Sequence, residues 1–264
     1  MKINNMKYEV ELNTALKAAQ AVRQIILDIY YSSFDIEIKS DNSPVTMADK
    51  TADEIIRKIL HEQFPTYGLL TEESSDNKER LNNDFVFIVD PIDGTKDFCA
   101  RNDEFTVNIG LSYKHEAVMG VIAIPVTGEI FYAVKGEGSY YLKDNKVQRI
   151  HVTDKLTDLT ALVSNFHSTD KEKALFKKYS DKIKHIKNLG SSIKGCSIAK
   201  GDAEISYRFS DNTKEWDTCA MQVILEEAGG YLLKFDGAPI KYNREDVYNH
   251  DGYVLVNRKE NFLL

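Results

Sequence analysis

The sequence is poor in cysteine, and its cysteines show no regular spacing. Only 3 of the 264 residues are cysteines, and no two of them form a CxxC pair. An odd and widely spaced set gives neither a disulfide framework nor a clustered zinc site, so both are excluded. We therefore expect Cys99, Cys196 and Cys219 to be buried and to pack as small hydrophobic side chains.

Long apolar runs and a recognisable export leader are missing as well. Residues 118–126 are largely apolar, but a membrane-spanning helix takes about 20 residues. The opening stretch MKINNMKYEVELNTAL lacks the basic segment and the following apolar segment of a secretory leader. We expect a cytoplasmic protein with no membrane span.

An excess of positive charge is also absent. Lys and Arg number 34 against 41 Asp and Glu, a net charge of −7, which disfavours an extended nucleic-acid surface. A small charged ligand stays open, because local basic side chains can bind it whatever the total charge. Residues 171–187 hold seven lysines against two acidic residues, and we interpret them as a solvated helix face.

The first half of the chain predicts helices followed by strands. Hydrophobic residues make up 42% of the chain, enough for a packed core. Apolar residues recur every three to four positions in residues 10–30, and 48–63 form a second helical stretch. Four closely spaced strand patterns then predict an antiparallel meander, at residues 85–89, 106–113, 117–125 and 129–135.

The second half predicts an α/β layer, because single strands alternate with helices. The strand patterns are residues 160–164, 203–209, 230–235 and 252–257, and the helical ones are 170–179, 192–200 and 216–228. No linker separates the halves. We expect an N-terminal α+β half, residues 1–153, and a C-terminal α/β half, residues 154–264, packed as one rigid unit.

The stretch FVFIVDPIDGTKDF, residues 85–98, ends an apolar strand in oxygen-bearing side chains. Pro91 cannot donate to a sheet ladder, so the strand is predicted to end at Asp90. Gly94 permits a bend that would bring Asp93 back to Asp90, with the Ile92 carbonyl facing the same point. Two such carboxylates repel unless a cation lies between them. Hard oxygen ligands without His or Cys select Mg²⁺, Mn²⁺ or Ca²⁺.

Other acidic stretches are less specific when taken singly. TEES at 71–74 is typical of a turn or helix start, and in EWDT at 215–218 Asp217 is typical of a helix cap beside a core Trp216. Thr46 predicts another cap, with Asp49 as a first-turn acid. Haloacid-dehalogenase phosphatases place one residue between their two aspartates. Here Pro91 and Ile92 separate them, which favours metal ligation over a phospho-aspartate.

Together, DPIDGT, the upstream TEE and the downstream WDT resemble a family of metal-dependent, lithium-sensitive phosphatases. It contains inositol monophosphatases, fructose-1,6-bisphosphatases and bisphosphate nucleotidases, and the motifs occur in its order over residues 42–257. Three stretches are similar to the CysQ-type 3′(2′),5′-bisphosphate nucleotidases: DNSPVTMADKTAD, GTKDFCARNDEFTVNIGL and NLGSSIKGCSIAKGDAEISYRF. Only DPIDGT is specific by itself.

The resemblance implies a layered αβαβα sandwich of mixed α+β and α/β character, and a metal centre. Two or three Mg²⁺ ions would be held by Glu72, Asp90, the Ile92 carbonyl, Asp93 and Asp217. Thr95 would orient the attacking water, and Asp49 would accept the Thr95 proton, with Glu72 also at the catalytic centre. The N–H groups of Gly94 and Thr95 would receive phosphate oxygens.

The substrate is implied by the same resemblance. The nucleotide and its second phosphate would be bound by His167, Ser191, Lys194 and Arg208. Taken singly, His167 is typical of a loop and Lys194 of a surface. The expected reaction is Mg²⁺-dependent hydrolysis of the 3′-phosphate of 3′-phosphoadenosine 5′-phosphate to AMP and phosphate, with 3′-phosphoadenylyl sulfate as a second candidate substrate.

Two other functions stay open. One is an inositol-1-phosphate phosphatase of the same superfamily. The other is a non-catalytic metal or nucleotide sensor, which has no need to keep both Asp49 and Thr95. A monomer and a homodimer are equally compatible with the sequence. The chain departs from the family pattern at Cys219 and Met221, where Ala and Gly are frequent, and both changes bear on packing behind Asp217.

Overall fold

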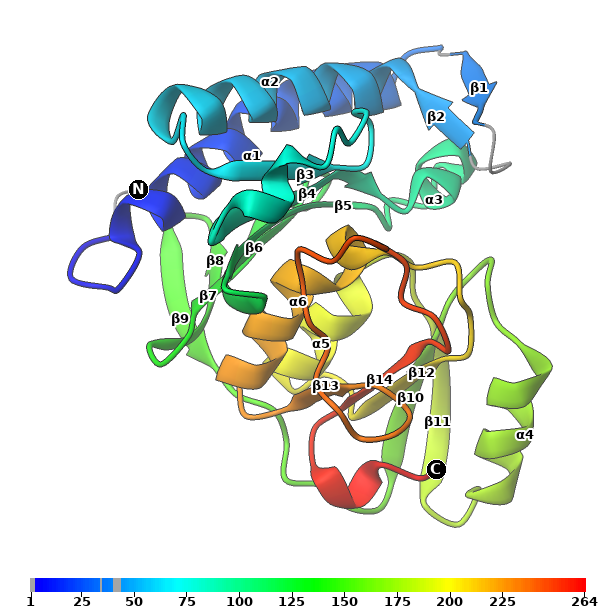
Figure 1. Ribbon diagram of the computed structural model, residues 1–264. Helices are drawn as coiled ribbons and strands as arrows, with labels where there is room; N and C mark the ends of the chain where they lie inside the picture. Colours follow the sequence, from blue (N-terminus) through cyan, green and yellow to red (C-terminus); the bar gives the residue numbers. More distant parts are fainter. Residues whose placement is uncertain (1–2, 34, 40–43) are drawn as a thin grey trace.

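The computed structural model describes residues 3–33, 35–39 and 44–264 of the chain. Residues 41–43, which open the DNSPVTMADKTAD stretch, lie outside this part. Helices and sheets are stacked in layers, and the outer helix pair lies at the opposite end of the molecule from α4 (Figure 1).

Two long helices pack side by side and form the first layer. They are α1 (Glu9–Tyr30) and α2 (Met47–Gln63), and both predicted helices are confirmed. A short hairpin of β1 (Ile36–Ile38) and β2 (Pro44–Thr46) leads into α2. Thr46 is the N-cap of α2 and its hydroxyl accepts the Ala48 N–H at 3.1 Å, as predicted.

A seven-stranded sheet forms the second layer, with its strands in chain order. They are β3 (Gly68–Thr71), β4 (Phe85–Asp93), β5 (Thr106–Tyr113), β6 (Glu116–Ile124), β7 (Glu129–Val134), β8 (Gly138–Lys143) and β9 (Lys146–Ile150). β3 and β4 are parallel and the later neighbours are antiparallel. The predicted four-strand meander is confirmed, whereas β3, β8 and β9 were not predicted.

A five-stranded sheet and its helices form the remaining layers, in the strand order β11-β10-β12-β14-β13. The strands are β10 (Leu159–Val163), β11 (Ile183–Asn188), β12 (Ile205–Arg208), β13 (Tyr231–Leu233) and β14 (Tyr253–Val256). The helices are α4 (Asp170–Lys178), α5 (Ile193–Lys200) and α6 (Glu215–Glu227). Short α3 (Thr95–Ala100) follows β4. The predicted alternation is confirmed, and β11 is an additional edge strand.

Three apolar cores hold these layers together. The first joins α1 and α2 to the seven-stranded sheet, the second surrounds α5 and α6 between the two sheets, and the third joins the five-stranded sheet to α4. Each fully buried leucine or isoleucine stabilises the packing by roughly 1.5–3 kcal/mol. The order of layers is αβαβα, so the predicted fold class is confirmed (Figure 1).

Strand β4 continues past Pro91, and the prediction that it ends at Asp90 is wrong. Asp90 pairs with Asn108 and Asp93 pairs with Thr106, so one extra residue is accommodated on β4. This is a β-bulge, one of the places where a sheet tolerates proline. Residues three apart on a regular strand point to opposite faces. The bulge removes that constraint and lets Asp90 and Asp93 face the same space.

Two strand glycines allow α6 to lie very close to the seven-stranded sheet. A Cβ atom on Gly110 would stand 2.5 Å from the Cys219 sulfur, and one on Gly120 would stand 2.3 Å from the Ala220 carbonyl oxygen. Either contact is far inside van der Waals distance, so only glycine fits. This close approach determines where the first turn of α6, which carries Asp217, meets the end of β4.

Two residues that differ from the family pattern, Cys219 and Met221, fit into the packing around α6. Cys219 and Met221 are 0% and 2% exposed. Gly195 on α5 makes room for Met221, because a Cβ atom there would lie 2.3 Å from the Met221 Cγ. Met221 therefore fills the space beside Gly195, and the helix keeps its position.

Two expectations about side-chain environment need correction. Cys196 and Cys219 are buried as expected, but Cys99 is only half-buried on α3. The lysine-rich segment is largely solvated, yet it is not one helix face. Helix α4 ends at Lys178, and the remaining lysines lie in the following turn and on edge strand β11. Lysines on an edge strand discourage pairing with another chain.

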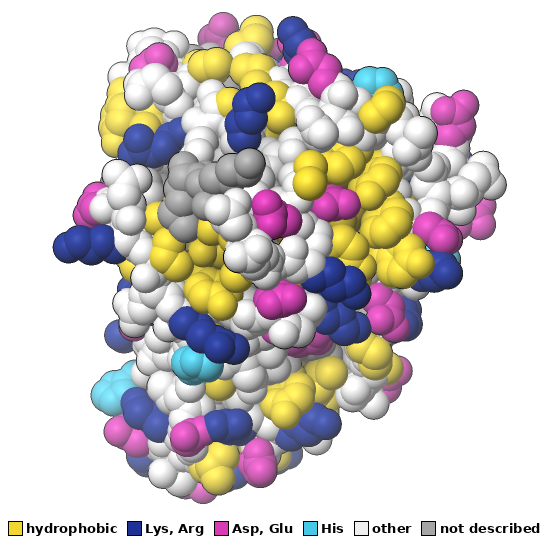
Figure 2. All heavy atoms as spheres, turned by 90° about the vertical axis from the view of Figure 1, so that its left-hand side faces the viewer, with side chains coloured by type: hydrophobic (Ala, Val, Ile, Leu, Met, Phe, Trp, Pro, Cys, Tyr) yellow, Lys and Arg dark blue, Asp and Glu magenta, His cyan; other side chains and the backbone are white. Residues whose placement is uncertain are grey.

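Acidic and basic side chains are interspersed on the face seen in Figure 2, with hydrophobic patches between them. Among the described residues, no helix is both long enough and apolar enough to cross a bilayer.

Candidate metal and phosphate site

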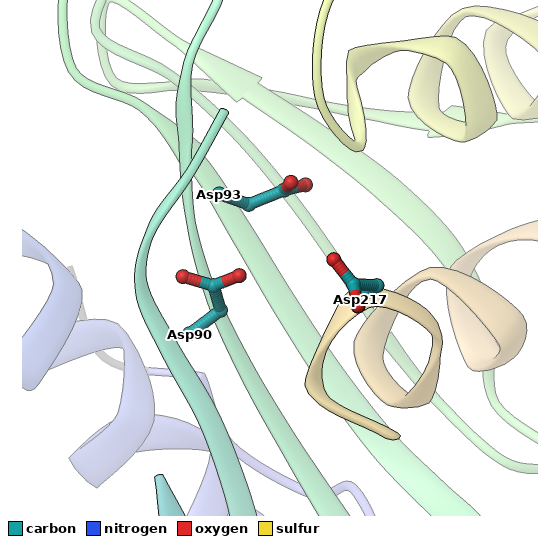
Figure 3. Close-up of side chains that lie close together, drawn as sticks. All are labelled: Asp90, Asp93 and Asp217. Atoms are coloured by element: carbon teal, nitrogen blue, oxygen red, sulfur yellow. The ribbon is translucent and has the colours of Figure 1, made fainter. Parts of the chain in front are cut away.

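Three carboxylates from distant parts of the chain converge at one point (Figure 3). Asp90 and Asp93 come from the bulged end of β4, and Asp217 comes from the first turn of α6. One oxygen from each lies within 4.8 Å of the others. The DPIDGT motif predicted that Asp93 lies close to Asp90. The fold brings Asp217 to the same point, as the family resemblance implied.

Burial makes this cluster electrostatically unfavourable without a cation. Asp90 is 2% exposed, and burial followed by the Glu72 and Asp93 charges raises its pKa well above the ordinary value. Burial and the neighbouring Asp93 raise the pKa of Asp217 to about 7. A divalent cation bound between such carboxylates would stabilise their ionised forms. The donor set, all oxygen, fits Mg²⁺ better than zinc.

Asp93 accepts more hydrogen bonds than the other two carboxylates of the cluster. Its Oδ2 accepts the backbone N–H of Ser192 at 2.6 Å and the Ser192 hydroxyl at 2.5 Å. Asn108 Nδ2 donates to the same oxygen at 3.2 Å, and the Thr106 hydroxyl lies 3.4 Å from it. Hydrogen bonds to a ligating carboxylate fix its orientation. Asp93 therefore joins β4 to the start of α5.

Asp217 is fixed by the start of its own helix. It is the third residue of α6, and its Oδ2 accepts the backbone N–H of Lys214, the N-cap residue, at 2.5 Å. The predicted helix cap is therefore confirmed, and the same side chain faces the carboxylate cluster.

Glu72 lies in the same cavity but pairs with a lysine. Its backbone N–H donates to the Val89 carbonyl at 3.2 Å, which extends the pairing of β3 with β4. Its Oε1 is 3.0 Å from Lys39 Nζ, and the same ammonium is 2.5 Å from Glu73 Oε1. Burial opposes the charge on Lys39, but the two glutamates raise its pKa above the ordinary value. Lys39 was not predicted from the sequence.

Thr95 connects the cluster to Asp49. The Thr95 hydroxyl lies 3.3 Å from Asp49 Oδ1 and 3.3 Å from the Ile92 carbonyl oxygen. Asp49 is held in turn by Thr46, whose N–H and hydroxyl donate to its Oδ2 at 2.8 and 2.6 Å. Burial raises the pKa of Asp49 to about 6. The Thr95 hydroxyl and the Asp49 carboxylate therefore lie within hydrogen-bond distance of each other.

Gly94 forms the bend between β4 and α3. Its φ of +93° belongs to the left-handed region, and it directly precedes Thr95, the first residue of α3. A Cβ atom here would stand 3.1 Å from the Ser191 Cβ. The bend predicted at Gly94 is thus present, and it lies against the loop before α5.

A cavity of about 300 Å³ contains the cluster and a basic wall. Its basic lining side chains are Lys96, His167, Lys194, Arg208 and Lys214. All the residues predicted for substrate binding line this cavity: Gly94, Thr95, His167, Ser191, Lys194 and Arg208. A volume of this size suits a small organic ligand, and its charges suit a phosphorylated one.

Burial lowers the pKa of two basic side chains that line the cavity. Lys194 is 9% exposed, and burial lowers its pKa to about 8. Its ammonium donates to the carbonyl oxygens of Leu189 and Ser191 at 3.1 and 2.8 Å, so it is anchored in the wall rather than extended on the surface. Burial and the nearby Arg208 lower the pKa of His167 to about 4, which leaves the ring neutral at neutral pH.

Ser191 has a strained backbone at the edge of this cavity. Its φ is +46°, unusual for a residue other than glycine. Its hydroxyl lies 3.4 Å from the Ile193 N–H at the first turn of α5. The neighbouring Ser192 was not predicted, although GSS before a helix is a cap signal that could have indicated it.

The family comparisons agree with this geometry. Residues 7–262 match the family model described as "Inositol monophosphatase family". A 3'(2'),5'-bisphosphate nucleotidase CysQ of Buchnera aphidicola is 34% identical over 91% of this chain and 90% of its own length. The protein of the same name from Escherichia coli K12 is 31% identical, over 92% of this chain and 98% of its own length.

Solved structures show the same fold. CysQ of Bacteroides thetaiotaomicron, described as a bacterial member of the inositol monophosphatase family, superposes with a TM-score of 0.81 at 34% identity, covering 97% of this chain and 100% of its own. An inositol monophosphatase from Thermotoga maritima superposes with a TM-score of 0.79 at 22% identity, over 94% of this chain and 92% of its own. On the family model, the curated relatives and the shared fold, this chain belongs to the inositol monophosphatase family.

Proposed function

We propose that this chain is a Mg²⁺-dependent phosphomonoesterase that hydrolyses the 3′-phosphate of 3′-phosphoadenosine 5′-phosphate, giving AMP and phosphate. The observation that carries the proposal is the group of three close carboxylates, Asp90, Asp93 and Asp217, which shares one cavity with a wall of basic side chains. The names of relatives that are 31–34% identical over nine-tenths of the chain support the nucleotide as substrate.

The metal would be held by oxygen ligands. Asp90, Asp93, Asp217, Glu72 and the Ile92 carbonyl are the candidates, with two or three Mg²⁺ ions as the expected number. The ions would supply positive charge for the phosphate and lower the pKa of the attacking water. Lys39 would compete with a metal for the Glu72 Oε1 oxygen, which lies 3.0 Å from its ammonium.

The protein's own part in the chemistry is to orient the water and remove its proton. The Thr95 hydroxyl hydrogen-bonds the water and passes its own proton to Asp49 Oδ1, 3.3 Å away. Since the pKa of Asp49 is about 6, its carboxylate is ionised and able to accept at neutral pH. The water gives its proton to the Thr95 oxygen, and the water oxygen bonds to phosphorus as the bond between phosphorus and O3′ breaks. O3′ leaves with that electron pair and takes a proton from solvent, which gives the 3′-hydroxyl of AMP.

The second phosphate distinguishes a bisphosphate from a simple monophosphate. Lys194 on α5 and Arg208 on β12 line the same cavity as the carboxylate cluster. Lys and Arg side chains provide the charge-assisted hydrogen bonds that phosphate needs. The same wall would accept the sulfated phosphate of 3′-phosphoadenylyl sulfate as a second substrate.

A phosphate-release assay tests the proposal. Purified protein with Mg²⁺ is given 3′-phosphoadenosine 5′-phosphate, 3′-phosphoadenylyl sulfate, inositol 1-phosphate or fructose 1,6-bisphosphate. We expect the highest kcat/KM on the first. A preference for inositol 1-phosphate would replace the proposed substrate with that of the inositol branch. No release from any substrate would favour a sensor without catalysis.

A further inference from the structure

The cavity has a second wall, which is aromatic. Trp216 and Tyr248 line it together with Lys214, next to the first turn of α6. The Lys214 ammonium stands 5.3 Å from the centre of the Trp216 ring and 5.4 Å from the centre of the Tyr248 ring. Both distances are within the range of a cation–π interaction. One ammonium thus contacts two rings of the same cavity.

The segment that carries Tyr248 is fixed to the helix that carries Asp217. Tyr248 forms an antiparallel β-bridge with Lys214, and the Asn249 N–H donates to the Thr213 carbonyl at 2.7 Å. Arg244 Nη1 donates to the Tyr248 carbonyl at 3.0 Å. These contacts hold the Tyr248 backbone in a defined place relative to the carboxylate cluster.

The two aromatic rings differ in their exposure to solvent. Trp216 is 8% exposed and belongs to the apolar core around α6, whereas Tyr248 is 37% exposed. The Tyr248 ring therefore lines the cavity while much of it remains open to solvent. An aromatic ring of this kind gains free energy when a flat apolar group covers it.

We propose that Tyr248, oriented by Lys214, is the stacking surface for the base of a nucleotide substrate. This rests on the proposed function, because it gives a binding place to the base of that substrate. Base stacking on an aromatic side chain depends on the base and not on the phosphates. Tyr248 would then be a specificity-determining residue that separates nucleotides from base-free phosphates.

The chain contains a residue whose fluorescence can report ligand binding in this cavity. Trp216 is its only tryptophan and lies 5.3 Å from the same ammonium. Titration of the protein in Mg²⁺ with AMP, the proposed product, is followed by Trp216 fluorescence excited at a tryptophan-selective wavelength. Ribose 5-phosphate is the base-free probe. We expect AMP to bind more tightly than ribose 5-phosphate, and to change the fluorescence more.

The decisive variant is Tyr248→Leu, with Tyr248→Phe as the partner that keeps the ring. We expect Tyr248→Leu to weaken AMP binding about fivefold to tenfold more than it weakens ribose 5-phosphate binding, the lower end of measured stacking effects. Tyr248→Phe should retain the preference for AMP. Lys214→Met should reduce that preference in part, since the tyrosine ring remains but is less well oriented.

The outcomes separate this inference from the proposed function. Equal weakening of AMP and ribose 5-phosphate by Tyr248→Leu would overturn the stacking role, even if wild-type protein hydrolyses the bisphosphate. Loss of the preference in Tyr248→Phe as well would assign the effect to the hydroxyl and also overturn it. Wild-type protein that binds AMP with a Tyr248-dependent preference but releases no phosphate would support the base site and refute the proposed reaction.

Discussion

Ser192 donates both its backbone N–H and its hydroxyl to one oxygen of Asp93, at 2.6 and 2.5 Å. The two residues come from different layers of the molecule, Asp93 from the end of β4 and Ser192 from the N-cap of α5. A buried serine thereby fixes the orientation of a carboxylate that is proposed to hold the metal. The first prediction concerns the loss of the hydrogen bond from the Ser192 hydroxyl.

Ser192→Ala should weaken Mg²⁺ binding about tenfold or more, because one donor to Asp93 is lost while the backbone donor remains. Isothermal titration calorimetry with Mg²⁺ measures the affinity directly. Ser197→Ala makes the same chemical change on the same helix, away from Asp93, and is the matched control. Unchanged affinity in Ser192→Ala would show that the backbone N–H alone holds the carboxylate.

Asp93→Asn should abolish turnover and yet stabilise the metal-free protein. The neutral amide is a poor ligand, but it also removes the charge that, after burial, contributes most to the raised pKa of Asp217. We expect the melting temperature without Mg²⁺ to rise by about 2–4 °C, which corresponds to about 1 kcal/mol in a protein of this size. A lower melting temperature would mean that Asp93 serves packing more than ligation.

Lys39→Met should destabilise the metal-free protein, because Glu72 and Glu73 would lose their shared counter-charge. Added Mg²⁺ should then raise the melting temperature more than it does in wild-type protein, since no ammonium competes for Glu72. Lys50→Met is the control: Lys50 pairs with Glu37 at 2.6 Å, but both side chains are exposed. Equal Mg²⁺ responses in the two variants would refute a competition between Lys39 and the metal.

Thr95→Ala should lower kcat by about 10²–10⁴-fold, the usual contribution of general acid–base catalysis, and leave Mg²⁺ affinity nearly intact. Thr95→Ser keeps the hydroxyl 3.3 Å from Asp49 and should recover most of the rate. Steady-state kinetics with calorimetry on the same samples separates the two effects. A Thr95→Ala enzyme that works at the wild-type rate would remove Thr95 and Asp49 from the proton pathway.

The KM for the bisphosphate should rise as the pH passes about 8. Burial lowers the pKa of Lys194 to about 8, so its ammonium is charged below that pH and loses its proton above it. The attraction for the second phosphate is therefore present at neutral pH and fades in mild alkali. Lys194→Met should give a higher KM without this rise. The same KM increase for a monophosphate would show that Lys194 does not face the second phosphate.

Much of the fold was predictable because its helices and strands carry clear periodic patterns. Residues 10–30 and 48–63 became helices, and the meander and the α/β alternation formed as expected. The prediction failed where tertiary pairing overrides local chemistry. Pro91 ends a regular strand, but a bulge against β5 accommodates it. Strand β9, mostly exposed at the sheet edge, has no alternating apolar pattern to indicate it.

The candidate site was predictable only in part. DPIDGT indicates a cation site through its spacing alone, and the family resemblance added Glu72, Asp217 and Asp49. The contact of Asn108 or Ser192 with Asp93 could not be inferred, because strand β5 and the loop before α5 meet β4 only in the folded molecule; the GSS signal indicates a helix start but not its partner. The same is true of Lys39, which lies 33 residues before its partner Glu72.

The close packing of α6 against Gly110 and Gly120 has a consequence for how the cation site tolerates change. Neither glycine has a functional group, yet any side chain there would push the helix outward and carry Asp217 away from Asp90. If Asp90 and Asp217 hold the proposed metal, the thickness of a helix–sheet interface would partly govern its affinity. Substitutions that add bulk far from any ligand atom would act as affinity mutations, with no change in the charge or hydrogen bonding of the site.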